Sequence, residues 1–158
     1  LPVPGEIPVW SEAWGAATDW LAEVETPLQE SGAGVFRGGD YDRWDLEVRG
    51  GVLGGVRLRM MTEEHGGGKQ FVRFKAWPHW PFASLLICGV AALLTLGAAL
   101  DHARIAVLVF GIIGLIAFVA MIVESAAAMA LVRGTLADLK RQIEAGAVPG
   151  ATSARLKK

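Results

Sequence analysis

The chain has 158 residues, of which 53% are hydrophobic and 20% charged, and its mean hydropathy is +0.40. This is too apolar for a protein of this size that is soluble throughout, and the length leaves room for only one small domain beside a membrane segment. The formal net charge is −1 and no dense basic region is present, which excludes nucleic acid as a partner.

The first predicted element is an amphipathic helix over residues 10–28, because apolar residues recur there at helical spacing. Pro27 conflicts with a regular helix, since proline removes a backbone hydrogen bond and clashes with the preceding turn. Two alternatives stay open: the helix is kinked near Thr26, or residues 7–10 form a strand and the helix is shorter. The apolar stripe consists of Trp10, Trp14, Ala17, Leu21, Val24 and Leu28.

Residues 34–77 alternate between apolar and polar side chains, a pattern typical of strands with one buried face. Glycine pairs and one glycine triplet separate the alternating segments, so consecutive strands are expected to form an antiparallel meander. Residues 1–81 are therefore predicted to form a cytoplasmic α+β domain, in which a small antiparallel sheet is covered by one helix.

The segment 38–45 is the densest polar run of this domain. Asp40 and Asp42 have the D-x-D pattern that holds a divalent cation in nucleotide-sugar enzymes, but an Asx-type turn leading into a strand explains the same residues. Arg43 is expected to pair across the sheet with an acidic residue: Asp45, Glu47 or Glu63.

A second polar run begins at Glu63, and three glycines follow His65, as expected for a hairpin loop with left-handed positions. We assign no catalytic, cofactor-binding or metal-binding residue in this chain. The candidate polar cluster consists of Asp40, Asp42, Arg43, Asp45, Glu63 and His65.

Three tryptophans, Trp10, Trp14 and Trp44, offer a sugar-stacking surface. Their positions on the helical stripe and at the start of a strand favour core packing instead.

Two apolar segments, 82–100 and 105–123, contain no charged side chain. At about 1.5 Å per residue each helix is roughly 28 Å long, close to the thickness of a bilayer's hydrocarbon core, about 30 Å. The short connection between them predicts an antiparallel transmembrane hairpin over residues 82–123. Trp77 and Trp80 precede the first span, where indole rings favour the headgroup layer.

Lysine and arginine are concentrated on the chain-end sides of the two spans, and only Arg104 lies in the turn. The positive-inside rule therefore predicts a multi-pass protein of the plasma (inner) membrane with both ends in the cytoplasm. Glu124 follows the second span directly. We expect it to be an interfacial residue, and the alternative is an ion or proton relay.

Residues 124–158 are predicted to form a short cytoplasmic amphipathic helix followed by a disordered tail. The helix is expected to lie on the membrane surface or against another domain. Its apolar stripe consists of Val132, Leu136, Leu139 and Ile143.

Taken together, the runs 10–14, 38–51 and 63–74 and the pair Trp77-Pro78 resemble the C-terminal region of large bacterial membrane glycosyltransferases of family 2. The likeness covers residues 8 to about 133. It implies a parent protein with an upstream cytoplasmic domain that binds a nucleotide sugar and transfers the sugar to a glycan or lipid acceptor, with Mg²⁺ or Mn²⁺.

None of the catalytic parts that the resemblance implies is recognised in this sequence, which begins at Leu1 without an initiator methionine. We therefore expect a non-catalytic C-terminal module of a longer enzyme, with no cofactor of its own. Its expected partners are the lipid bilayer, the upstream catalytic domain and a glycan or lipid acceptor. The alternative is a membrane-anchored cytoplasmic protein-interaction module without an enzymatic role.

Overall fold

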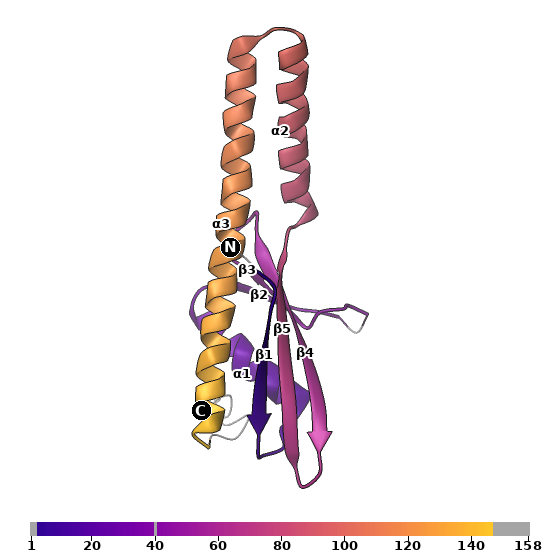
Figure 1. Cartoon of the computed structure of the whole chain (residues 1–158), viewed down its shortest axis with the longest axis vertical. Helices are drawn as coiled ribbons and strands as arrows, with labels where there is room; N and C mark the ends of the chain where they lie inside the picture. The colour runs from indigo at the N-terminus through magenta and orange to yellow at the C-terminus, as the bar shows by residue number, and fades with distance from the viewer. Residues whose placement is uncertain (1–2, 40, 147–158) are drawn as a thin grey trace.

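The computed structural model describes residues 3–39 and 41–146. The elements form an elongated molecule, with two long helices paired at one end and a sheet at the other (Figure 1). In chain order they are β1 (Gly5–Ser11), α1 (Ala17–Glu30), β2 (Gly34–Arg37), β3 (Leu46–Arg49), β4 (Gly55–His65), β5 (Lys69–His79), α2 (Phe82–Leu100) and α3 (Arg104–Glu144).

The strands form one antiparallel five-stranded sheet in the order β1-β5-β4-β3-β2. Strands β2 to β5 form the expected meander, in which each strand pairs with the next, and β1 pairs with β5. The hairpin between β4 and β5 turns at residues 66–68, where Gly67 and Gly68 both have φ +81°. This confirms the hairpin loop predicted from the glycine triplet, and the α+β fold is confirmed as well.

The N-terminal segment settles the alternatives raised by Pro27. Residues 5–11 form β1, whose backbone pairs along its whole length with β5, and α1 begins only at Ala17. The helix predicted over 10–28 is therefore too long at its N-terminal end, and the strand alternative is correct. Pro27 lies inside α1, near its C-terminal end.

The expected core packing of Trp10 and Trp14 is wrong, since they are 43% and 58% exposed. Because side chains alternate across a strand, Trp10 faces away from the core that its neighbour Val9 enters. Trp20, which lies outside the predicted stripe, is the tryptophan that is fully buried.

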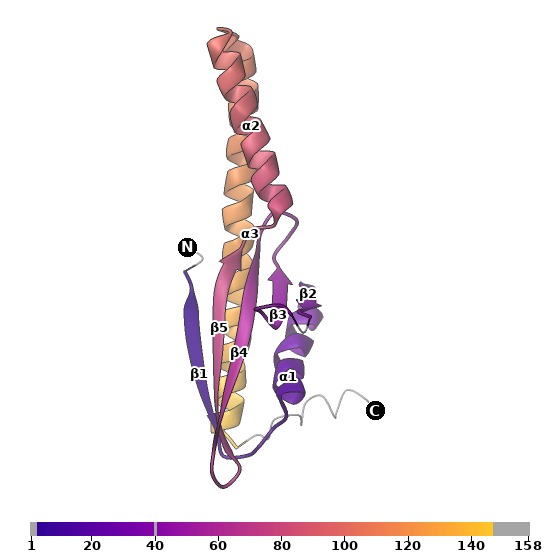
Figure 2. The ribbon, with the colours of Figure 1, turned by 90° about the vertical axis from the view of Figure 1, so that its right-hand side faces the viewer.

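One face of the sheet is covered by α1 and by the second half of α3, which lie on the same side of it (Figure 2). The other face, called the open face below, carries the alternate residues of each strand and is covered by no described helix. The core between sheet and helices includes Val9, Trp20, Val24, Leu28, Leu46, Val48, Val56, Leu58, Val72, Phe74, Met129, Val132 and Leu136.

Helix α2 and the first part of α3, up to residue 123, form the helical hairpin (Figure 1). The turn between them includes His102 in the left-handed region, with φ +56°. Among the described residues, two helices are long and apolar enough to cross a membrane. Their large side chains are exposed, as Leu93 at 70% and Ile105 at 80% illustrate.

Helix α3 differs from the expectation of a span followed by a separate short helix. It is one helix of 41 residues that continues from the hairpin into the core of the sheet domain. The alanine-rich segment 124–131 explains this continuity, because alanine has the highest helix propensity and no glycine or proline interrupts it.

The stripe predicted on this helix packs against the sheet of the same chain and not on a membrane surface. Val132 and Leu136 are fully buried, Leu139 is 4% exposed and Ile143 is 8% exposed. The sheet is thus covered by two helices, where we expected one. The predicted disordered tail from residue 147 to 158 lies outside the described residues. We call the sheet, α1 and residues 124–144 of α3 the head.

Candidate functional site

The polar run 38–45 serves as a turn in the part that the structure describes. The Asp42 carboxylate accepts a hydrogen bond of 2.7 Å from the Gly39 backbone N–H, as in an Asx-type turn. Asp45 accepts one of 2.6 Å from the Met60 N–H on β4. Both carboxylates therefore hold backbone groups, while Asp40 lies outside the described residues.

Arg43 is exposed. It forms no ion pair with Asp45, Glu47 or Glu63, the residues with which it was expected to pair. Glu47 instead pairs with Arg49 and Arg57, and Glu63 pairs with Arg73.

His65 is the last residue of β4, beyond the Met60 position that Asp45 contacts, and its ring lies 5.3 Å from that of Trp10 in an edge-on arrangement. No described contact joins Glu63 or His65 to Asp42 or Asp45. Within residues 3–39 and 41–146, no group of three His, Cys, Asp or Glu side chains is placed to hold a metal ion.

The first site that sequence reasoning missed is the junction between the helical hairpin and the head. Its central element is the junction loop, residues 50–54, which connects β3 to β4. The Glu124 carboxylate on α3 accepts hydrogen bonds from the backbone N–H groups of Leu53 (2.6 Å) and Gly54 (2.9 Å). On α2, the Ser84 hydroxyl donates to the Leu53 carbonyl (2.7 Å). Both long helices therefore hold the same loop.

Glycines allow the junction loop to approach α3 this closely. A Cβ atom at Gly50 would overlap the Glu124 carbonyl oxygen, one at Gly51 the Glu124 carboxylate, and one at Gly54 the backbone of α3. Ser125 is fully buried at this contact, and its hydroxyl has no hydrogen-bond partner among the described residues.

The second missed site is the Glu47 cluster on the open face, which consists of Glu47, Arg49, Arg57 and His79. The Glu47 side chain is only 5% exposed, and its two oxygens accept hydrogen bonds of 3.0 Å from the Nε atoms of Arg49 and Arg57. The His79 Nε2 atom lies 3.8 Å from the same carboxylate.

Aromatic rings support both guanidinium groups of the cluster. Arg49 lies over the ring of Phe36, with its Cζ atom 4.8 Å from the centroid, and Arg57 lies over Trp44 at 4.7 Å. A planar guanidinium that is stacked and hydrogen-bonded at Nε has little rotational freedom left. Each arginine is thus fixed with its terminal nitrogens free of described partners.

The environment of the cluster shifts two pKa values. Burial by itself raises the pKa of the Glu47 carboxyl, but the hydrogen bonds from Arg57 and Arg49 and the charge of His79 outweigh burial, so the net pKa is lowered. Burial and the positive charge of Arg57 lower the pKa of His79, against the opposing effect of Glu47. At neutral pH the cluster therefore holds two arginine cations, one carboxylate and a neutral imidazole.

Strand register places the cluster at the end of the open face nearest α2. Arg49, Gly55 and His79 lie side by side on β3, β4 and β5, and the next row contains Glu47 and Arg57. His79 is the last residue of β5, and α2 begins at Phe82.

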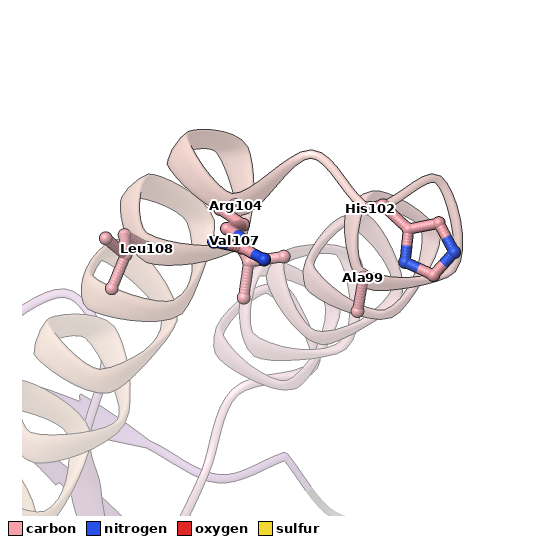
Figure 3. A pocket seen from close by; sticks show the side chains of 5 residues that line it. All are labelled: Ala99, His102, Arg104, Val107 and Leu108. Atoms are coloured by element: carbon pink, nitrogen blue, oxygen red, sulfur yellow. The ribbon is translucent and has the colours of Figure 1, made fainter.

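A shallow pocket lies at the turn of the helical hairpin, at the other end of the molecule (Figure 3). Among the described residues, its polar lining consists of His102 and Arg104, beside Ala99, Val107 and Leu108. Its lining does not combine the carboxylate and the base that acid–base chemistry needs.

Part of the junction site was visible in the sequence. Two glycine pairs lie within six residues, 50–55, and a lone carboxylate follows an apolar span. The junction partners Leu53 and Glu124 lie about 70 residues apart in the chain, so only the fold brings them together. No family model, curated protein or solved structure matches this chain.

Proposed function

We propose that this chain is a non-catalytic, membrane-anchored accessory module that holds its head at a fixed height above the bilayer. One observation carries the proposal: α3 runs without a break from the exposed apolar hairpin into the buried core of the head. A continuous helix transmits position and orientation, whereas a flexible linker does not.

The hairpin supplies the anchor. Its two helices present large apolar side chains outward on a length suited to a bilayer. An antiparallel pair leaves the head and the C-terminal end of α3 on one side of the membrane, and the bias of lysine and arginine toward that side favours the cytoplasmic face of the inner membrane.

The resemblance to family 2 glycosyltransferases suggests which enzyme this module serves. In that case the catalytic domain, with its Mg²⁺ or Mn²⁺ and its nucleotide-sugar donor, belongs to the upstream part of the same protein. The head would position that domain near its glycan or lipid acceptor at the membrane surface.

Cysteine labelling tests the anchorage. In a Cys88→Ser background, one new cysteine replaces His102 in the hairpin turn, and in a second variant one replaces Asp138 on the exposed side of α3. In intact cells, a membrane-impermeant maleimide is expected to label position 102 only, and in inverted vesicles position 138 only. Labelling of both positions from the same side would contradict the spanning hairpin.

Enzyme assays test the accessory role. The chain alone, reconstituted in bilayers, is expected to hydrolyse no nucleotide sugar, whereas complexes purified from native membranes through this chain are expected to contain a metal-dependent sugar-transfer activity. Turnover by the chain alone that is abolished by Asp40→Asn or Asp42→Asn would overturn the non-catalytic role.

A second candidate is a membrane-anchored interaction module with no link to an enzyme. The open face favours it, because aromatic and cationic side chains such as Trp10, Phe71 and Arg59 lie there without a covering helix. Crosslinking from this face in native membranes separates the two candidates. A crosslinked partner without a nucleotide-sugar-binding domain would favour the second.

A further inference from the structure

We infer that the Glu47 cluster is a binding site for the phosphate of an anionic membrane lipid. The inference deepens the proposed membrane anchorage and rests on it. It starts from the hydrogen-bonding capacity that the cluster leaves unused. Arg49 and Arg57 each donate through Nε to Glu47, and among the described residues nothing occupies their terminal nitrogens.

The free donors are arranged for an anion with several oxygens. Each guanidinium has two terminal nitrogens with four N–H groups, and Glu47 holds both groups by their Nε atoms from one buried position. Planar, paired N–H donors match the oxygens of a phosphate. Stacking on Phe36 and Trp44 fixes both groups beforehand, so binding loses little side-chain entropy.

The charge and exposure of the cluster also suit an anion. Two arginine cations and one carboxylate leave a net charge of +1, because the lowered pKa of His79 keeps the imidazole neutral. The side chains of Arg49 and Arg57 are 46% and 29% exposed, so a ligand can reach them, while the carboxylate that would repel an anion is buried beneath them.

The position of the cluster identifies the source of the phosphate. Arg49 immediately precedes the junction loop that Glu124 and Ser84 hold at the base of the hairpin. His79 lies in the same row and is separated from α2 by two residues. If the hairpin spans the bilayer, this row lies at the level of the lipid headgroups, where phosphates are abundant and free soluble anions are depleted.

Lipid selectivity measured in bilayers tests this inference. The full chain is reconstituted in phosphatidylcholine bilayers, and electron spin resonance compares the association of spin-labelled phosphatidylglycerol with that of spin-labelled phosphatidylcholine. The wild-type chain is expected to prefer phosphatidylglycerol, and added salt should weaken the preference. Equal association of the two lipids at low salt would overturn the inference.

The decisive variant is E47Q/R49Q/R57Q, which removes the site without leaving a buried unpaired charge. It lowers the net charge by one, and so does the control K140Q on the exposed far end of α3. The triple variant is expected to lose selectivity by about tenfold, as for one lost charged hydrogen bond, whereas the control keeps it. Equal selectivity of both variants would assign any preference to general charge and contradict the site.

Two further measurements narrow the ligand. R49K/R57K keeps the charge but not the planar donors and is expected to lose part of the preference, so unchanged selectivity would contradict the guanidinium geometry. Inorganic phosphate at constant ionic strength is expected not to compete, and complete competition would show that the site takes a free anion. Alkaline extraction of the same membranes tests the anchorage separately. A chain that stays in the bilayer but shows no lipid preference would disprove this inference and leave the proposed anchorage standing.

Discussion

The carboxylate of Glu124, in the middle of α3, accepts a hydrogen bond of 2.6 Å from the backbone N–H of Leu53 in the junction loop. This contact joins the helix that leaves the hairpin to the sheet that the helix covers. An acidic residue at the end of an apolar span suggests an ion relay when it is considered alone. Here its oxygen is committed to two backbone N–H groups, which supports a structural role.

Removing the Glu124 carboxylate is expected to loosen the junction. Glu124→Ala leaves the N–H groups of Leu53 and Gly54 without their acceptor, so the head should lose about 2 kcal/mol of stability. Hydrogen exchange at residues 53 and 54 and thermal unfolding in detergent measure the effect. The control Glu144→Ala, at an exposed site, is expected to change neither. Unchanged exchange at residues 53 and 54 would show that the contact contributes nothing.

Adding one methyl group is expected to have opposite effects at two glycines. A Cβ at Gly54 meets the α3 backbone, so Gly54→Ala should destabilise the chain by about 1–3 kcal/mol. Gly134 lies within α3 with nothing within 4 Å of its Cβ position, and Gly134→Ala should stabilise the helix by about 0.5–1 kcal/mol. Unfolding midpoints of the two variants provide the comparison, and a Gly54→Ala variant at least as stable as the wild-type chain would contradict the close approach of the loop.

Two buried serines near the junction are expected to respond differently to alanine. The Ser84 hydroxyl donates to the Leu53 carbonyl, so Ser84→Ala should cost about 1 kcal/mol. The Ser125 hydroxyl has no described partner, and Ser125→Ala should be neutral or stabilising. Denaturant titration of both variants tests this ranking. If Ser125→Ala proves the more destabilising variant, its hydroxyl has a partner that the contacts above do not include.

The Glu47 cluster is expected to make the stability of the head decrease toward acidic pH. Folding lowers the pKa of His79 from its ordinary value of 6.5, so the folded chain binds fewer protons there and stability falls as pH decreases below that value. The lowered pKa of Glu47 adds a second loss as pH falls from 4.5 through the folded pKa.

Unfolding midpoints between about pH 8 and pH 3 measure this dependence. His79→Gln should remove the loss that begins below pH 6.5 and keep the one that begins below pH 4.5, because glutamine does not titrate. A wild-type chain that becomes more stable between about pH 7 and pH 5.5, or a variant with the unchanged profile, would contradict the lowered pKa of His79.

The sequence was sufficient for elements whose evidence is local. Alternation over residues 46–76 predicts the strands, the glycine triplet predicts the hairpin loop, and the uncharged run after Phe82 predicts a long apolar helix, because each pattern is contained in one short segment. It failed where two local patterns compete. The helical spacing from Trp10 to Leu28 suggested one helix, but β1 pairs along its whole length with β5, whose partner residues lie about 60 to 70 positions further along the chain.

The two sites required the tertiary structure for the same reason. The glycines of the junction loop and Glu124 are unremarkable separately, and only the packing of α3 on the sheet places them in contact. Arg49 lies two residues from Glu47 on β3, and the register adds Arg57, which lies opposite Glu47 on β4. By itself the sequence determined the composition of the elements and the apolar length of the hairpin. The tertiary structure decided which polar groups meet, because such contacts depend on strand order and helix placement and not on spacing along the chain.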